Sequence, residues 1–326
     1  MKKLVALLLL LTLAFTLISC TPKQENEQRT INVGYLSGPT GMGMAKMIND
    51  NIDSDKYTFT LQDQTAALVA LQKGELDIVC VPTNLAAQKY NTDMTDIVVL
   101  AVNCLNSLFV ISSEAEANIT SMNDLDGKTV YTCLQGTPRL ILQHLIDELQ
   151  LNVTVKTEHN GNTLTTPQDL QAALIASPGE ISIAVLPEPL VSAVIANTKN
   201  AYAVRVDLAD AWSTISDTPI AMGCIVAKAD FVNENKALVN EFLAEYKASI
   251  EYMSNATNID SAAKYVAEAK IMGAEALAKK ALANLGDSIA YVDGDDMKNT
   301  LEYVFAVFGN KVIGGKLPDE KFYYKK

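Results

Sequence analysis

Small polar residues, glycines and prolines cluster where apolar, strand-like runs of the sequence end. The run INVGYL is followed by SGPTGMG at 37–43, LDIVCV is followed by PTN at 82–84, and a third apolar run ends at Asn103. Two later runs end in QGTP at 135–138 and PEP at 187–189. Ligands of open α/β sheets bind beyond the carboxyl ends of the strands. These segments together therefore predict one binding site.

The chemistry that these segments offer is that of helix starts. Thr137 suits an N-cap and Pro138 the first helical position, which leaves the next backbone N–H groups free. Thr40 and Thr83 can play similar parts. Free N–H groups and the positive end of a helix dipole attract anions and hydrogen-bond acceptors, and glycines let a ligand approach the backbone closely.

Two charged residues beside these segments point to opposite ligand charges. Arg139 opposes the dipole of the helix that it opens, and a bound anion would offset that; Glu188 satisfies a dipole itself or receives a ligand amine. We expect a small anionic organic solute, and a planar heterocycle is the alternative. The candidate ligand-binding residues are Ser37, Gly38, Pro39, Thr40, Gly41, Met42, Gly43, Thr83, Asn84, Asn103, Gln135, Gly136, Thr137, Arg139 and Glu188.

Each candidate also has a purely structural interpretation. GPTGMG could be a tight turn, since it matches neither the P-loop, which ends in GK[ST], nor the GxGxxG fingerprint. LPEP could be a rigid turn, Asn84 and Asn103 could form turns, and Arg139 could be a solvated surface charge. The recurrence of such segments at several strand ends favours a shared site.

The sequence shows no pattern typical of catalysis or of a metal centre. The only two histidines are His144 and His159, neither of them near a cysteine, and no nucleophile–base pair is recognisable. The acidic segment at 293–296 lacks EF-hand spacing. We therefore expect a binding protein that needs no cofactor, rather than an enzyme.

Alternating strand and helix patterns must position these segments. From residue 31 on, short apolar runs alternate with helical periodicity, which predicts an α/β fold with parallel sheets. The run TPIAMGCIVAK at 218–228 looks like a strand that returns to the first unit. We predict a first lobe of residues 31–112 plus 216–326 and a second lobe of residues 113–215. Two crossings between lobes make a hinge, with a cleft between the lobes.

Composition and charge exclude some function classes. Of 326 residues, 49% are hydrophobic and 20% charged, which is typical of globular chains. The formal net charge of −12 argues against nucleic-acid binding and against electrostatic attachment to anionic lipid, because both need a surplus of lysine and arginine.

The first 30 residues read as a targeting segment. Lys2 and Lys3 precede an apolar run that is too short for a membrane span, so residues 1–19 are predicted to be a signal peptide. The run ends in LISC, which resembles a bacterial lipobox. Cys20 is therefore the predicted lipidation site, and residues 20–30 form a flexible tether. An ordinary signal peptide with an incidental cysteine is the alternative.

The remaining cysteines do not form a recognisable motif. Cys80, Cys104, Cys133 and Cys224 each lie in an apolar run, and none belongs to a CxxC pair. We expect buried free thiols that act as small hydrophobic residues. A disulfide among them is the alternative, because an exported protein meets an oxidising environment.

The order of the motifs resembles a known family. GPTGMGMAKMI, VPTNLAAQKYN, LDGKTVYTCLQGTPRLILQHLI, AVLPEPLVSAVIA and IGGKLPDEKFYY follow one another over residues 31–324. This order is similar to that of substrate-binding lipoproteins of ABC importers, in the nitrate/sulfonate/taurine-type branch related to the NMT1/THI5-like domain.

The resemblance implies a two-lobed periplasmic-binding-protein (type II) fold with two interlobe crossings. It also implies a monomeric receptor outside the cytoplasm, lipid-anchored to the bacterial cell membrane, which closes on a small solute and delivers it to an ABC permease and its ATPase. Two alternatives stay open. One is a non-transport enzyme on the same scaffold, THI5-like or menaquinone-pathway-like, and the other is a surface sensor.

Overall fold

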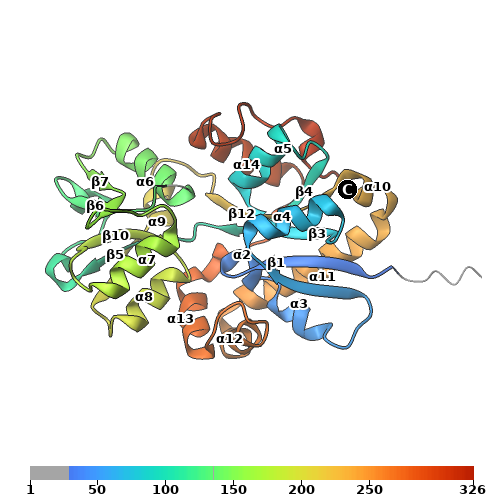
Figure 1. The fold of residues 1–326 in the computed structure, drawn as a ribbon, viewed down its shortest axis with the longest axis horizontal. Helices are drawn as coiled ribbons and strands as arrows, with labels where there is room; N and C mark the ends of the chain where they lie inside the picture. Colours follow the sequence, from blue (N-terminus) through green and yellow to red (C-terminus); the bar gives the residue numbers. More distant parts are fainter. Residues whose placement is uncertain (1–28, 135) are drawn as a thin grey trace, which may run out of the picture. The chain divides into compact units, whose positions relative to one another are not determined.

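Two five-stranded sheets form the centre of the structure, a computed structural model that describes residues 29–134 and 136–326. The strands of each sheet group with their own helices in Figure 1. In spatial order the first sheet consists of β2 (Tyr57–Gln62), β1 (Ile31–Leu36), β3 (Ile78–Pro82), β12 (Ala221–Lys228) and β4 (Ile97–Leu105). The second sheet consists of β11 (Tyr202–Asp207), β5 (Leu108–Ser113), β10 (Ile183–Pro187), β6 (Thr129–Tyr131) and β7 (Thr154–Lys156). A small hairpin pairs β8 (Glu158–His159) with β9 (Asn162–Thr163).

Helices alternate with these strands, as the sequence pattern predicts. The helices whose chain segments flank the first sheet are α2 (Pro39–Met42), α3 (Ala45–Asp50), α4 (Gln64–Lys73), α5 (Thr83–Thr92), α10 (Ala229–Glu234), α11 (Lys236–Ser254), α12 (Ile259–Glu268), α13 (Glu275–Leu285) and α14 (Gly294–Phe308). Those of the second sheet are α6 (Thr137–Glu148), α7 (Pro167–Ala176), α8 (Leu190–Asn197) and α9 (Leu208–Ser213). Short 3₁₀ turns are η1 (Glu114–Glu116), η2 (Met122–Leu125), η3 (Ala256–Asn258), η4 (Gly286–Ser288) and η5 (Glu320–Phe322). The α/β class is confirmed.

Strand direction differs from the prediction. β1 runs parallel to β2 and β3, as expected, but β12 runs antiparallel to both β3 and β4, and β5 runs antiparallel to β10 and β11. A continuous apolar run indicates a strand that is buried on both faces, whatever its direction. The return of β12 to the first sheet, in contrast, agrees with the prediction.

The chain passes between the sheets at two places that touch each other. β4 ends at Leu105 and β5 begins at Leu108, so residues 106–107 form the first crossing; residues 214–220 lead from α9 back to β12. The backbone N–H of Asn106 donates to the Ile220 carbonyl (3.0 Å), and the Ile220 N–H donates to Asn106 Oδ1 (2.9 Å). The prediction placed residues up to 112 in the first lobe, whereas β5 pairs within the second sheet.

The only tryptophan of the sequence lies beside the second crossing. Trp212 in α9 is buried, and its Nε1 donates to the Thr218 carbonyl (2.6 Å). Its ring lies 5.3 Å from the His144 ring in α6 and 6.1 Å from the Tyr303 ring in α14. α14 also contacts α5, β4 and β12 of the first sheet. The environment of Trp212 therefore includes elements of both sheets.

The described cysteines and helices agree with part of the expectations. Cys80, Cys104, Cys133 and Cys224 are buried, and Cys80, Cys104 and Cys224 are free thiols. Between residues 29 and 326, Gln135 apart, no helix has the length and apolarity that crossing a bilayer requires. The predicted signal peptide and the lipidation site Cys20 lie outside the described residues, as does most of the tether.

Candidate functional site

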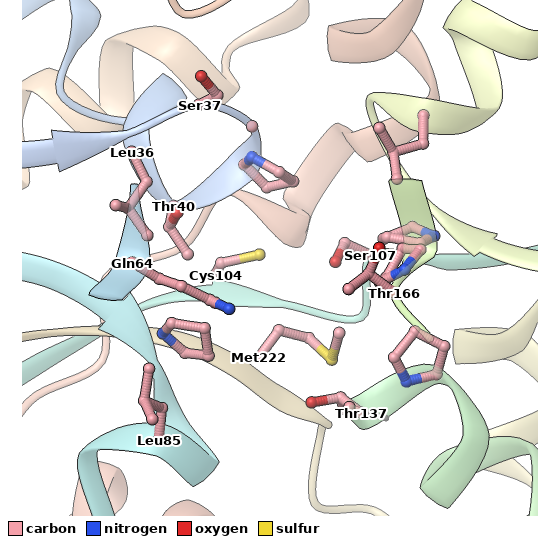
Figure 2. Close-up of a pocket in the computed structure, with 18 of the residues that line it drawn as sticks. Leu36, Ser37, Thr40, Gln64, Leu85, Cys104, Ser107, Thr137, Thr166 and Met222 are labelled. Atoms are coloured by element: carbon pink, nitrogen blue, oxygen red, sulfur yellow. The ribbon is translucent and has the colours of Figure 1, made fainter. Parts of the chain in front are cut away.

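A cavity of about 770 Å³ lies between the strand ends of the two sheets. The first sheet contributes the segments after β1, β2, β3 and β4, and the second contributes the start of α6, the start of α7 and the segment after β10. Ligand pockets for small organic molecules have volumes on the order of 300–1,000 Å³. Figure 2 shows side chains from both sheets around this space, among them Thr40 and Gln64 on one side and Thr137 and Thr166 on the other.

About half of the candidate residues line the cavity. They come from four of the strand-end segments that the sequence singled out, and they are Ser37, Gly38, Pro39, Thr40, Asn84, Gly136, Thr137 and Glu188. Gly38 has a φ of 92° and precedes α2, a conformation that L-residues other than glycine rarely adopt. The Gly38 carbonyl accepts hydrogen bonds from the N–H groups of Gly41 and Met42 (both 3.0 Å).

The second half of the 37–43 segment packs into the core instead. Gly41, Met42 and Gly43 do not line the cavity. A Cβ added to Gly41 would lie 1.9 Å from the Leu36 carbonyl oxygen, and one added to Gly43 would lie 2.8 Å from Ile250 Cγ1. These two glycines therefore permit close packing of the chain at positions that do not line the cavity.

Thr83 and Asn103 lie behind the residues that form the wall of the cavity. Thr83 is fully buried, and its hydroxyl donates to the Ala221 carbonyl (2.8 Å). Asn103 is fully buried too, and its Nδ2 donates to the Thr40 carbonyl (3.0 Å) and to the Tyr246 hydroxyl (2.9 Å). Both residues support the lining segments without belonging to the lining.

The charged candidate of α6 lies outside the cavity. Arg139 is exposed, and its Nη1 donates to the Leu134 carbonyl (3.3 Å). Gln135 lies outside the described residues. The aromatic residues Tyr35, Tyr131 and Trp212, which could stack on a planar heterocycle, are not among the lining residues either.

Among the helices of at least ten residues that begin at the cavity, α5 and α6 have no side-chain cap from a described residue. α5 begins after Pro82 and α6 after Gly136, and neither N-cap residue makes a side-chain cap hydrogen bond. The first N–H groups of a helix have no partner within the helix. α5 follows a strand of the first sheet and α6 follows one of the second, so each sheet supplies one uncapped start.

Glu188 is the most buried charged residue of the lining, with 1% exposure. Its Oε2 accepts a hydrogen bond from the Ser192 N–H (3.1 Å), and its Oε1 accepts bonds from the Ser192 hydroxyl (2.9 Å) and from Asn284 Nδ2 (2.6 Å). Burial raises the pKa of this carboxyl, and the three hydrogen bonds partly offset that rise. Because Asn284 belongs to α13, the Glu188 carboxylate also links α13 to α8.

Several lining residues were not predicted. They include Gln62, Asp63, Gln64 and Thr65 after β2, the start of α7, Cys104, Ser107 and Met222. The strand-end rule that selected the other segments applies equally to Tyr57–Gln62, so Gln62–Thr65 carried a usable signal. Thr166 and Pro167 carried the N-cap and N1 signal. Met222, beside a register shift of β12, carried none.

The described lining offers hydrogen bonding and apolar contact. Its ionisable side chains are Asp63, Cys104 and Glu188, and burial raises the pKa of the Cys104 thiol to about 12. Asp63 caps α4, because its Oδ1 accepts from the N–H groups of Thr65 and Ala66 (both 2.9 Å). Within the part of the chain that the structure describes, no group of three or more histidine, cysteine, aspartate or glutamate side chains is arranged to hold a metal ion.

Solved structures of transporter components share this fold. An ABC transporter from Parabacteroides distasonis is 20% identical, with a TM-score of 0.72 over 91% of this chain and 99% of that chain. The periplasmic aliphatic sulphonate binding protein SsuA from Escherichia coli is 15% identical, with a TM-score of 0.67 over 91% and 92% of the two chains. A ligand binding component of an ABC-type import system from Staphylococcus aureus, solved with zinc bound, is 15% identical, with a TM-score of 0.66 over 91% and 97%. The predicted periplasmic-binding-protein fold with two crossings is thereby confirmed.

Sequence comparison gives the family. Curated protein sequences yielded no significant match. A family model described as menaquinone biosynthesis matches residues 41–285, which is more than half of the 326-residue chain and includes the cavity segments of both sheets apart from residues 36–40. The chain therefore belongs to the menaquinone biosynthesis family.

Proposed function

We propose that the protein is a solute-binding receptor that holds a small organic molecule in the cavity between its two sheets. The observation that carries the proposal is the paired supply of uncapped helix starts, α5 from the first sheet and α6 from the second, at one cavity. A ligand that touches both sides favours the closed arrangement over an open one. The ligand-binding role of the lining residues is part of this proposal.

The cellular setting is proposed on other grounds. We place the receptor outside the cytoplasm, anchored through lipidated Cys20 as a monomer, and delivering its solute to an ABC permease with its ATPase. The sequence of residues 1–30 and the structural likeness to transporter binding proteins support this placement. Membership of the nitrate/sulfonate/taurine-type branch stays a prediction from the motif order.

The anchor has its own test. In a bacterial host that processes lipoproteins, the wild-type chain should sediment with membranes, and a Cys20→Ala variant should be released. Membrane retention of the Cys20→Ala protein, with the wild type retained equally, would count against the anchor.

The binding role is tested by thermal unfolding of the chain from residue 21 on. A small-molecule extract of bacterial cells should raise the melting temperature by several degrees, because a ligand that binds only the folded state stabilises it. Thr137→Val should weaken the effect because Thr137 lines the cavity, whereas Thr83→Val should lower stability without changing the ligand-induced shift. If the extract leaves the melting temperature unchanged, the receptor proposal fails.

A second candidate, an enzyme of the menaquinone pathway, is favoured by the family match. On this reading Glu188 is the buried lining carboxylate available for proton transfer, since Asp63 is exposed and caps α4. Incubation with the same extract and mass analysis before and after distinguish the two. A receptor returns its ligand unchanged, whereas an enzyme depletes a compound in proportion to the incubation time. The Glu188→Gln variant of an enzyme should deplete that compound far more slowly than the wild type does.

A further inference from the structure

The charges around the cavity decide which class of solute it favours. Among the described lining residues there is no lysine, arginine or histidine, and the carboxylates are Asp63 and Glu188. Arg139, the residue that made an anion attractive from the sequence, is exposed and lies outside the lining. A buried anionic group with no cationic partner is costly, because desolvation removes its interaction with water.

Helix dipoles supply the positive charge of the wall. Each helix start carries roughly half a positive charge. At α4 and α8 a carboxylate already faces that charge, since Asp63 accepts from the N–H groups of Thr65 and Ala66, and Glu188 accepts from the Ser192 N–H. The starts of α4 and α8, each with its carboxylate, therefore carry a small excess of negative charge.

The starts of α5 and α6 carry an excess of positive charge instead. α5 and α6 have no side-chain cap from a described residue, so their partial positive charges stay available to the cavity. The start of α2 also lacks a side-chain cap, and at the start of α7 the Asp169 carboxylate accepts from the Thr166 N–H. Three helix starts therefore carry a positive excess charge and three a negative one, so the wall as a whole is close to neutral. It nevertheless offers N–H donors at α5 and α6 for acceptor atoms of a ligand.

The remainder of the wall is suited to a compact, weakly polar molecule. Prolines at 39, 82, 138, 167, 187 and 189 line the cavity, and Leu85 and Met222 add apolar surface. Figure 2 shows the Met222 thioether and the Gln64 amide reaching into the same space as the Thr137 hydroxyl. The described lining therefore offers neutral hydrogen-bonding groups and two carboxylates, and it contains no cationic side chain.

We propose that the solute carries no net charge, being uncharged or zwitterionic, and that it is held through acceptor atoms by the uncapped starts of α5 and α6. This inference rests on the proposed receptor function and replaces the anionic solute expected from the sequence. It commits the cavity to a ligand class that differs from the sulphonate named for the Escherichia coli structural relative.

The test separates ligands by charge before binding. A bacterial small-molecule extract is divided by ion exchange at neutral pH into an anionic pool and a pool without net negative charge, and each is added to the chain from residue 21 on. The pool without negative charge should raise the melting temperature, and the anionic pool should not. An equal or larger shift from the anionic pool overturns the inference while the receptor proposal stands. No shift from either pool defeats the receptor proposal, and the inference falls with it.

A charge variant tests the cause. Gln64→Lys places a cation in the cavity, and the variant should bind anions from the first pool at least about tenfold more tightly than the wild type does. Gln72→Lys, at the exposed end of the same helix, is the matched control and should behave as the wild type. If Gln64→Lys gains no response to the anionic pool, wall charge does not select the solute and the inference is overturned.

Discussion

At the scale of the residue, Asn103 and Cys104 of β4 show what the sequence alone could not predict. Side chains alternate between the two faces of a strand. Asn103 was a candidate and is buried behind the wall, whereas its neighbour Cys104 lines the cavity. The sequence predicted that β4 ends near the site, but it could not tell which face of β4 meets the cavity.

The Glu188 carboxylate predicts a specific pH dependence. Because burial raises its pKa in the folded protein above the ordinary value of 4.5, the folded state binds the proton more tightly than the unfolded state. Its contribution to stability is therefore complete below pH 4.5 and is lost as the pH rises through the folded-state pKa. In Glu188→Gln that loss is absent, so the stability difference between variant and wild type should shift in favour of the variant as the pH increases.

Urea unfolding of both proteins across pH 4 to 8 measures this difference. Other carboxyls, such as Asp93 and Asp319, have lowered pKa values and act in the opposite direction, but they are common to both proteins and cancel. A pH-independent difference would show that Glu188 does not titrate as its burial predicts.

Gly41 predicts the packing cost of one methyl group. Its Cβ would meet the Leu36 carbonyl oxygen at 1.9 Å, so Gly41→Ala forces the start of α2 away from β1. We expect a loss of about 1–3 kcal/mol in the free energy of unfolding. Gly273→Ala is the control, because nothing lies within 4 Å of the added atom and no positive φ is involved. Equal stability of the two variants in urea unfolding would contradict the packing role.

At the scale of the element, the order of strands and helices was largely predictable. The apolar runs that precede Ser37, Pro82 and Asn103 correspond to β1, β3 and β4, although β4 continues to Leu105. Hydrophobic periodicity and N-cap residues are local properties of the chain, so they can be recognised in a single sequence.

Elements defined by long-range pairing were not predictable in the same way. β5 follows β4 after two residues, and both strands are apolar, so no composition change marks the passage from one sheet to the other. In the structure, the backbone of Asn106 at this passage adopts a left-handed conformation, with a φ of 42°. The crossing is set by pairing with residue 220, more than a hundred positions away.

Asn106 therefore predicts how the crossings are held. Its side chain accepts the Ile220 N–H, and its backbone adopts a left-handed conformation that glycine tolerates and alanine resists. Asn106→Ala should lose about 1–3 kcal/mol of unfolding free energy, and Asn106→Gly should lose less, because only the side-chain hydrogen bond disappears. Equal losses in chemical denaturation would mean that the backbone conformation contributes nothing.

At the scale of the whole molecule, a change in the arrangement of the two lobes should be visible in Trp212. The ring touches His144 of α6 and Tyr303 of α14, and α14 also packs on the first sheet. Solute binding should change the intensity or wavelength of tryptophan emission, and Trp212→Phe should abolish that signal while heat of binding persists. If calorimetry shows saturable binding while Trp212 emission stays unchanged, the cavity is not coupled to the contacts that Trp212 makes with α6 and α14.

The central claim is that one solute binds in the cavity between the two sheets. The most direct test recovers the compound that stabilises the chain from the extract and titrates it calorimetrically into wild-type protein, Asn84→Trp and Gln72→Trp. Asn84 is half-buried in the lining, and Gln72 is exposed at the far end of α4. The account predicts one-to-one binding to the wild type and to Gln72→Trp, weakened at least about a hundredfold in Asn84→Trp because the larger ring fills the cavity. Unchanged affinity in Asn84→Trp would contradict it.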